Sequence, residues 1–218
     1  MNEIWTRLEE QLRIHTPGIA ARLRPGVGEA QLAAFETEIG RRFPDDLRLS
    51  YLRHDGCEYV DKPPEVSVAG LLGHQEWMPL KRSLEEWREW QAMFNDDDPY
   101  FFGDDVDRSS WSKSRIRPWQ TPPPSWLPLG QYVGLAERIF VDMLPGPVGR
   151  VGQIILVNPA ARRGIEAASW GAYLAALTEG LEQGLVEMTT GDSVPYPRWT
   201  VIATGQPFQA PGFVLNCP

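Results

Sequence analysis

The sequence predicts an α+β fold, in which helices occupy the first part of the chain and strands follow. Apolar residues recur at helical spacing in several segments before residue 95, each bounded by capping residues or by glycine and proline. Two β-branched runs, 139–143 and 151–157, are separated by proline and glycine. We therefore expect these runs to be two strands that are joined by a loop and pair antiparallel.

The first helix is predicted over residues 1–13, where Trp5 and Leu8 belong to one apolar stripe and charged residues occupy the opposite face. This pattern is typical of a helix that docks on a core. Pro17 suits the first position of a helix, because its fixed φ is helical and its missing N–H is not needed there. A short second helix is therefore expected to run to about Leu23.

A third helix is predicted over residues 28–39, with Gly40 placed where a helix commonly ends in a left-handed residue. A fourth helix begins at Pro44. Two aspartates lie beside its positive N-terminal end and Arg53 lies near its negative end, as the helix dipole favours. We expect this helix to end at His54.

A fifth helix is predicted over residues 83–94, because Ser83 and Glu86 form the S-x-x-E pattern of a capping box. It opens the most polarised part of the chain. Between residues 85 and 107 there are nine carboxylates against one base, Arg88, and aromatic side chains are interleaved with them.

This acidic and aromatic stretch has two interpretations. It can be a solvated surface that keeps the protein in solution, as most charge runs are. Alternatively, it is a recognition surface, where carboxylates steer a basic partner and aromatic anchors hold it. Under the second interpretation we assign the partner contact to seven residues: Trp90, Asp96, Asp97, Asp98, Tyr100, Asp104 and Asp105.

Three further elements are expected in the second half of the chain. A short strand over 126–129 contains Pro128, which cannot donate to a sheet, so this strand is expected at a sheet edge or a strand end. Ser169 begins a helix whose apolar residues extend to Leu185. The segment 189–218 is too apolar to be a disordered tail.

Composition excludes several classes of protein. The chain has 218 residues and a net charge of −8, which argues against nucleic-acid binding because that depends on clustered Lys and Arg. There is no membrane-spanning or signal-peptide pattern, so we expect a cytoplasmic protein without a membrane partner. Cys57 and Cys217 are too few and too far apart for a disulfide scaffold or a zinc finger. Phosphate-binding, metal and cofactor motifs are also missing, so we expect no cofactor and no metal.

The tetrapeptide from His54 to Cys57 invites comparison with a thiol nucleophile and its base. Such chemistry needs both groups within hydrogen-bond reach, and adjacent placement in the sequence is poor geometry for that. The structural interpretation is that His54 caps a helix, the following Asp-Gly turns the chain, and Cys57 is a small apolar residue entering the sheet. We favour this structural interpretation over a hydrolase.

Several motifs follow one another in a defined order along the chain. They are Trp5-x-x-Leu8-x-x-x-Leu12, Arg24-Pro25-Gly26-Val27-x-Glu29, Phe35-Glu36-x-x-Ile39-Gly40, Phe43-Pro44-Asp45-Asp46-Leu47-Arg48-x-x-Tyr51-x-x-His54-Asp55-Gly56, Trp126-Leu127-Pro128, Val141-Asp142, Gly152-Gln153-Ile154-Ile155 and Ala168-Ser169-x-x-x-Tyr173-Leu174. In this order they resemble the SUKH superfamily in its Smi/Knr branch, which contains fungal cell-wall regulators and bacterial immunity proteins that neutralise toxins.

The resemblance implies an α+β fold with a central, mostly antiparallel sheet, flanked by N-terminal helices and a C-terminal helix. It covers one domain over 1–187, and we expect a C-terminal extension over 188–218, which the family pattern does not predict, to pack on this domain. It also implies that the shared motifs are structural, that the protein is not an enzyme, and that variable segments choose the partner.

From this resemblance we expect an immunity protein that binds and neutralises a cognate polymorphic or contact-delivered toxin acting in the cytoplasm, such as a nuclease. The acidic balance suggests that the partner is a toxin domain with a basic surface. The alternative is a non-catalytic regulatory scaffold like the fungal cell-wall synthesis regulators.

Overall fold

The computed structural model describes residues 1–59, 69–73, 75–94, 115–116, 126–131, 138–158, 162–190, 197–210 and 214–215. Its helices are α1 (Asn2–His15), α2 (Pro17–Ala20), α3 (Glu29–Glu38), α4 (Asp45–Arg53), α5 (Leu80–Phe94) and α7 (Trp170–Glu182). Its strands are β1 (Leu23–Pro25), β2 (His54–Cys57), β3 (Glu76–Trp77), β4 (Trp126–Gln131), β5 (Arg138–Asp142), β6 (Gln153–Asn158), β7 (Arg162–Ala167), β8 (Val186–Thr189), β9 (Arg198–Val201), β10 (Gln206–Pro207) and β11 (Val214–Leu215). The α+β prediction is confirmed.

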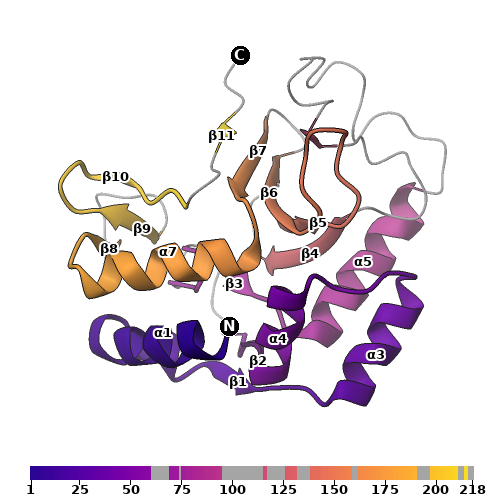
Figure 1. Cartoon of the computed structure of the whole chain (residues 1–218), viewed down its shortest axis with the longest axis horizontal. Coiled ribbons are helices and arrows are strands. Elements are labelled where there is room, and N and C mark those ends of the chain that lie inside the picture. The colour runs from indigo at the N-terminus through magenta and orange to yellow at the C-terminus, as the bar shows by residue number, and fades with distance from the viewer. Residues whose placement is uncertain are drawn as a thin grey trace.

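The largest sheet has six strands in the order β11-β7-β6-β5-β4-β3, and every neighbouring pair is antiparallel. In its centre, Phe140 of β5 is paired with Ile155 of β6, which confirms the expected antiparallel pairing of these two runs. Strands β1 and β2 form a small separate sheet, and β8, β9 and β10 form another. Helix α7 lies between α1 and the large sheet, while α5 lies on the other side of the molecule (Figure 1).

The large sheet is buried on both faces. Successive side chains of a strand point to opposite faces, and in β5 Ile139 and Val141 enter the main core with the helices α1, α4 and α7. Phe140 enters a second, smaller core that also contains Trp90 of α5 and Trp126 of β4. Helix α5 therefore contributes to both cores.

Four aromatic side chains, all fully buried, form the centre of the main core. The ring of Trp77 in β3 lies 5.4 Å from that of Trp5 in α1, 5.1 Å from Tyr51 in α4 and 5.2 Å from Trp170 in α7, measured between centroids. The Trp5 indole N–H donates to Ser50 Oγ at 2.9 Å. A two-residue strand thus joins three helices through one indole ring.

Two of the predicted helix boundaries are wrong. Helix α2 ends at Ala20, because Leu23–Pro25 is taken up as strand β1 against β2. The capping box at Ser83 does not form, since α5 already begins at Leu80. The Ser83 hydroxyl instead donates to the Pro128 carbonyl.

Two further expectations are corrected. Leu185 lies beyond the end of α7 and is exposed, because Gly184 at φ +63° turns the chain after the helix. Strand β4 is not at the sheet edge, since β3 pairs with it at Gly130 and Gln131. Pro128 is tolerated because β3 is short and its pairing does not extend to that position.

The described parts of the C-terminal segment contact the rest of the chain. The Trp199 indole N–H and the Tyr173 hydroxyl both donate to the Leu71 carbonyl, at 2.9 and 3.1 Å. Strand β11 pairs with β7 in the large sheet. Strand β8 spans the expected boundary at residue 187, and that boundary remains a prediction. Among the described helices, none is long and apolar enough to cross a membrane.

The aromatic centre predicts a large stability loss for Trp77→Ala. Removing the ring leaves a cavity between three helices, which cannot all move in to close it. We therefore expect a loss of about 3–5 kcal/mol in the free energy of unfolding. Denaturant unfolding followed by circular dichroism measures it. Tyr59→Ala is the control, because Tyr59 is 52% exposed, and it should cost below about 1 kcal/mol. Equal losses in the two variants would contradict the central role of Trp77.

Candidate functional site

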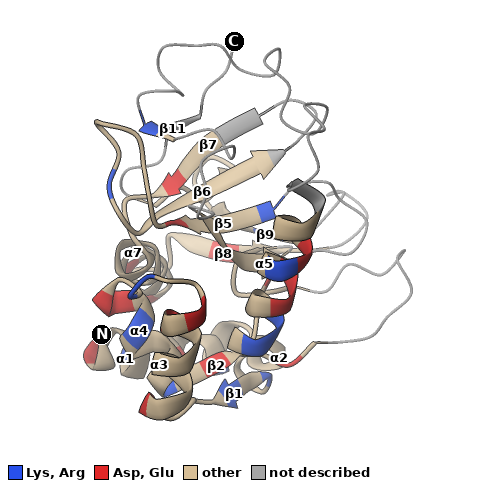
Figure 2. Ribbon diagram, turned by 90° about the vertical axis from the view of Figure 1, so that its right-hand side faces the viewer, with Lys and Arg blue, Asp and Glu red and all other residues tan. Residues whose placement is uncertain are grey.

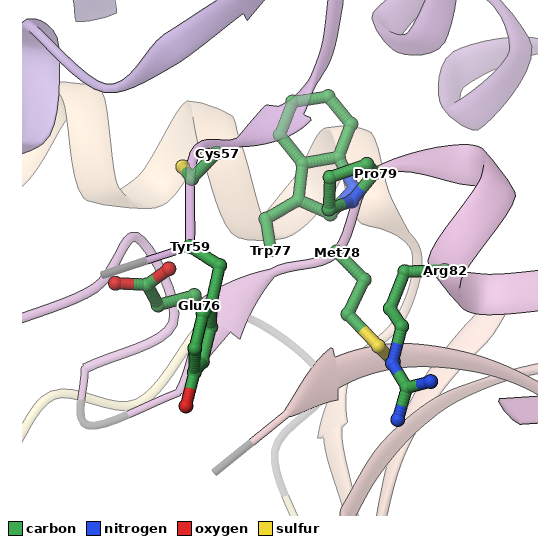
Figure 3. Close-up of a pocket in the computed structure, with 7 residues that line it drawn as sticks. All are labelled: Cys57, Tyr59, Glu76, Trp77, Met78, Pro79 and Arg82. Carbon is green, nitrogen blue, oxygen red and sulfur yellow. The ribbon is translucent and has the colours of Figure 1, made fainter. Parts of the chain in front are cut away.

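A pocket of about 420 Å³ opens where β2, β3 and the start of α5 meet. Figure 3 shows the Met78 and Arg82 side chains running side by side, with Tyr59 facing them across the pocket. Nearly all of the lining surface is apolar. The lining residues are Cys57, Tyr59, Glu76, Trp77, Met78, Pro79 and Arg82.

The pocket adjoins the main core at Trp77, which belongs to both. Glu76 and Met78 lie on either side of Trp77 in the sequence, so strand alternation directs their side chains away from the Trp77 ring. Figure 3 shows that ring turned away from Met78. The Tyr51 hydroxyl donates to the Met78 carbonyl at 3.2 Å, and the Met78 N–H donates to the Leu129 carbonyl at 2.9 Å. The pocket backbone is thereby fixed from both the helical and the sheet side.

Asp55 and Gly56 place the start of α5 at the pocket. The Asp55 carboxylate accepts from the Leu80 N–H at 2.7 Å, so it caps the first turn of the helix from a distant part of the sequence. Burial raises the pKa of Asp55, against the hydrogen bond from Leu80 and the charge of Arg24. Gly56 has φ +70°, and a side chain there would clash with the Met78 backbone. Only glycine allows this close approach.

The charged groups of the pocket already have partners. Glu76 forms an ion pair and hydrogen bond with Arg22, whose guanidinium also donates to the Ala69 carbonyl. Burial raises the pKa of Glu76, although Arg22 acts in the opposite direction. Arg82 pairs with Glu86, one helical turn along α5. The pocket therefore offers a mainly apolar surface, and its two charged side chains, Glu76 and Arg82, are each paired with a neighbouring charge.

The thiol and imidazole of the hydrolase interpretation are poorly suited to catalysis. Cys57 is 1% exposed, and burial raises the pKa of its thiol to about 12, so the reactive thiolate is scarce at neutral pH. His54 is engaged elsewhere: its Nδ1 lies 3.0 Å from the Arg24 carbonyl oxygen and its Nε2 lies 2.9 Å from the Glu9 carboxylate. As the sequence suggested, Cys57 is a buried residue of a strand.

The same carboxylate of Glu9 also accepts from Arg53 at 2.9 Å. Burial alone would raise the pKa of Glu9, but the hydrogen bonds from Arg53 and His54 outweigh it, and the pKa lies below its ordinary value. This cluster fixes the end of α4 to α1. Across the part of the chain that the structure describes, no group of three or more His, Cys, Asp or Glu residues could hold a metal ion.

Of the seven residues assigned to partner contact, only Trp90 lies among the described residues. It is 7% exposed and packs edge-on against Phe140, with ring centroids 5.0 Å apart, so its burial is explained by the second core. The other six lie outside the described residues: Asp96, Asp97, Asp98, Tyr100, Asp104 and Asp105. The assignment of the acidic stretch to a partner contact remains a prediction.

The described acids of this stretch are partly neutralised. Arg82 lies within 4 Å of Glu85, Glu86 and Glu89 on its own helix. Arg88 pairs with Glu38 of α3. The count of nine carboxylates against one base over residues 85–107 leaves out Lys81 and Arg82, which lie one helical turn earlier. It therefore overstates the negative charge of this part of α5.

The pocket could not be recognised as a site from the sequence. Its residues come from a two-residue strand, the end of β2 and the first turn of α5, and no single motif contains them. Only the pattern Met78-Pro79-Leu80 indicates part of it, because proline is common at the start of a helix.

Residues 26–176, which include every residue lining the pocket, match the model of the SMI1 / KNR4 family (SUKH-1). The chain is 25% identical over 208 residues to the glucan synthesis regulatory protein of Neurospora crassa, covering 83% of this chain and 38% of that protein. It is 25% identical over 191 residues to the cell wall biosynthesis/cell cycle regulator smi1 of Schizosaccharomyces pombe, covering 84% and 36%. A shorter match, 36% over 73 residues, covers 34% of the chain and 14% of F-box only protein 3 of Homo sapiens. The chain spans less than two fifths of each relative.

These relatives contradict the expected toxin-neutralising immunity protein. The two fungal proteins are named as regulators of glucan synthesis, cell-wall biosynthesis and the cell cycle. The regulatory alternative fits them better. The shared motifs lie in helix starts, turns and core positions, which fix the fold and not the partner, so the motifs alone could not separate an inhibitor from a regulator.

The helix cap predicts different effects for two substitutions of Asp55. Asp55→Ala leaves the Leu80 N–H buried without an acceptor, so we expect a loss of about 1–2 kcal/mol in the free energy of unfolding. Asp55→Asn keeps the accepting oxygen without a buried charge and should lose less than half of that amount. Denaturant unfolding of both variants measures this, and equal losses would show that the carboxylate does not act as a cap.

Cys57 is predicted to be chemically inert in the folded protein. In a Cys217→Ser background, where Cys57 is the remaining thiol, its reaction with a disulfide reagent at about pH 8 should be at least about 100-fold slower in the native than in the denatured protein. Absorbance stopped-flow measures both rates. Similar rates in the two states would restore Cys57 as a candidate nucleophile.

Proposed function

The chain belongs to the SMI1 / KNR4 family (SUKH-1), and from this premise we propose that it is a regulatory protein that acts by binding a partner protein, without catalysing a reaction. The names of the two fungal relatives, a regulator of glucan synthesis and a regulator of cell-wall biosynthesis and the cell cycle, support a regulatory role. The pocket beside Tyr59 and Met78 is the proposed contact.

The observation that carries this proposal is the chemical character of the pocket. Its surface is apolar, its charged groups are engaged by neighbouring side chains, and its thiol is buried. An enzyme needs an accessible nucleophile, acid or base with a pKa matched to its task. A binding site needs apolar surface that a partner can remove from water, and methionine and tyrosine are enriched in such contacts.

The pocket walls are also held in position before any partner binds. Tyr51 and Leu129 fix the Met78 backbone, and Asp55 fixes the start of α5. A preformed site loses little conformational entropy on binding, so more of the contact energy contributes to affinity. The cytoplasmic location and the absence of a nucleic-acid partner, both suggested by the sequence, remain predictions.

Tyr59→Asp tests the proposal, because it puts a charge on an exposed pocket wall without touching the core. Ile202→Asp is a matched control: Tyr59 is 52% exposed and Ile202 is 51% exposed, and Ile202 follows β9 in the C-terminal hairpin. Candidate partners are first co-purified with the unchanged protein from cells of the organism that encodes it. Each candidate is then purified and titrated by calorimetry against the unchanged protein, Tyr59→Asp and Ile202→Asp. We expect Tyr59→Asp to weaken binding by about tenfold or more and Ile202→Asp by less than about twofold.

Two results would overturn the proposal. One is a reconstituted partner that binds both variants as tightly as the unchanged protein. The other is the failure to reconstitute any complex, together with a catalytic activity that Cys57→Ala abolishes.

A further inference from the structure

Building on the proposed function, we infer that the pocket receives a large apolar side chain from a partner segment that carries Lys or Arg beside it. The occupant is thus a basic protein segment with an apolar anchor. The apolar lining selects the anchor, and the excess of carboxylates around the rim selects the basic flanks.

The anchor follows from the shape and lining of the pocket. A volume of about 420 Å³ lies in the lower part of the range of about 300–1,000 Å³ that ligand-binding pockets span, which suits one or two side chains. Met78 is only 2% exposed and lines the pocket with its apolar side chain, and the exposed ring of Tyr59 forms the opposite wall. The Arg82 guanidinium is held by Glu86, so its aliphatic stem is the part that faces an incoming side chain.

The basic flanks follow from the charges around the rim. Arg82 stands among three carboxylates of α5: Glu86, and Glu85 and Glu89 at 3.7 Å each. Lys81 lies 3.9 Å from Glu85 and supplies the second cation. Figure 2 shows the acidic and basic residues along the exposed side of α5.

Among the described residues, the rim has three carboxylates against two cations, so it keeps a negative excess that a partner cation can offset. An acidic segment would instead have to compete with these carboxylates for Arg82. A second copy of this chain is disfavoured for the same reason, because the protein carries a net charge of −8. Glu76 does not change this balance, since Arg22 neutralises it.

A peptide selection tests the inference directly. A library of short random peptides is selected on the full chain and counter-selected on Tyr59→Asp. We expect the enriched sequences to share one large aliphatic or aromatic residue with Lys or Arg within a few positions of it. Their affinity, measured by fluorescence polarisation, should fall by about tenfold between about 50 mM and about 300 mM NaCl, because salt screens exposed charges.

Charge reversal on the rim provides the matched comparison. The double variant Glu85→Lys with Glu89→Lys should weaken the selected peptides by about tenfold. The control is Glu179→Lys with Glu187→Lys, which makes the same change of charge at exposed sites on α7 and β8, and should change affinity by less than about twofold. In both views α7 lies on the side of the molecule away from α5 (Figures 1 and 2).

The outcomes separate this inference from the proposed function. An acidic consensus, a consensus without an apolar position, no Tyr59-dependent peptide, or equal effects of the two double variants would each overturn the inference. If the cellular partner still depends on Tyr59 in that case, the proposed function stands. If instead basic apolar peptides bind as expected but no cellular partner depends on Tyr59, the pocket specificity stands and the proposed function fails.

Discussion

The burial of the Trp77 indole between three helices is the interaction on which the rest of the structure depends. Strand β3 has only two residues and could not hold its place through its few backbone hydrogen bonds. Contacts of Trp77 with Trp5, Tyr51 and Trp170 supply what the strand pairing lacks. The same ring joins the edge of the large sheet to the helical layer, so the two parts of the α+β fold are coupled at one side chain.

The position of the pocket is a consequence of this burial. Once Trp77 faces the core, the alternation of the strand directs Met78 to the other side, and Pro79 then starts α5 at once. Asp55 secures that start from another part of the chain. The burial of Trp77 and the lining of the pocket are therefore linked, because Trp77, Met78 and Pro79 are consecutive in the sequence. The pocket forms in this way without a long structured loop.

Local signals were sufficient for the helices that carry their own boundaries. Gly40 ends α3 at φ +68°, and the Ser169 hydroxyl accepts from the Ala172 N–H at the start of α7, as the sequence patterns indicated. The start of α5 could not be predicted, because its cap is Asp55, which is 25 residues away. The pocket was missed for the same reason, since it depends on how distant segments meet. The biological role was wrongly predicted, because helix starts and core positions carry no information about the partner.

The close approach of Gly56 to the Met78 backbone also has an evolutionary consequence. Any side chain at this position meets main-chain atoms, so drift at Gly56 is closed to the protein, whereas the exposed Tyr59 three residues later can vary at little cost to folding. The turn at Gly56 is therefore fixed by the fold, whereas the pocket wall at Tyr59 can change without disturbing the turn beside it.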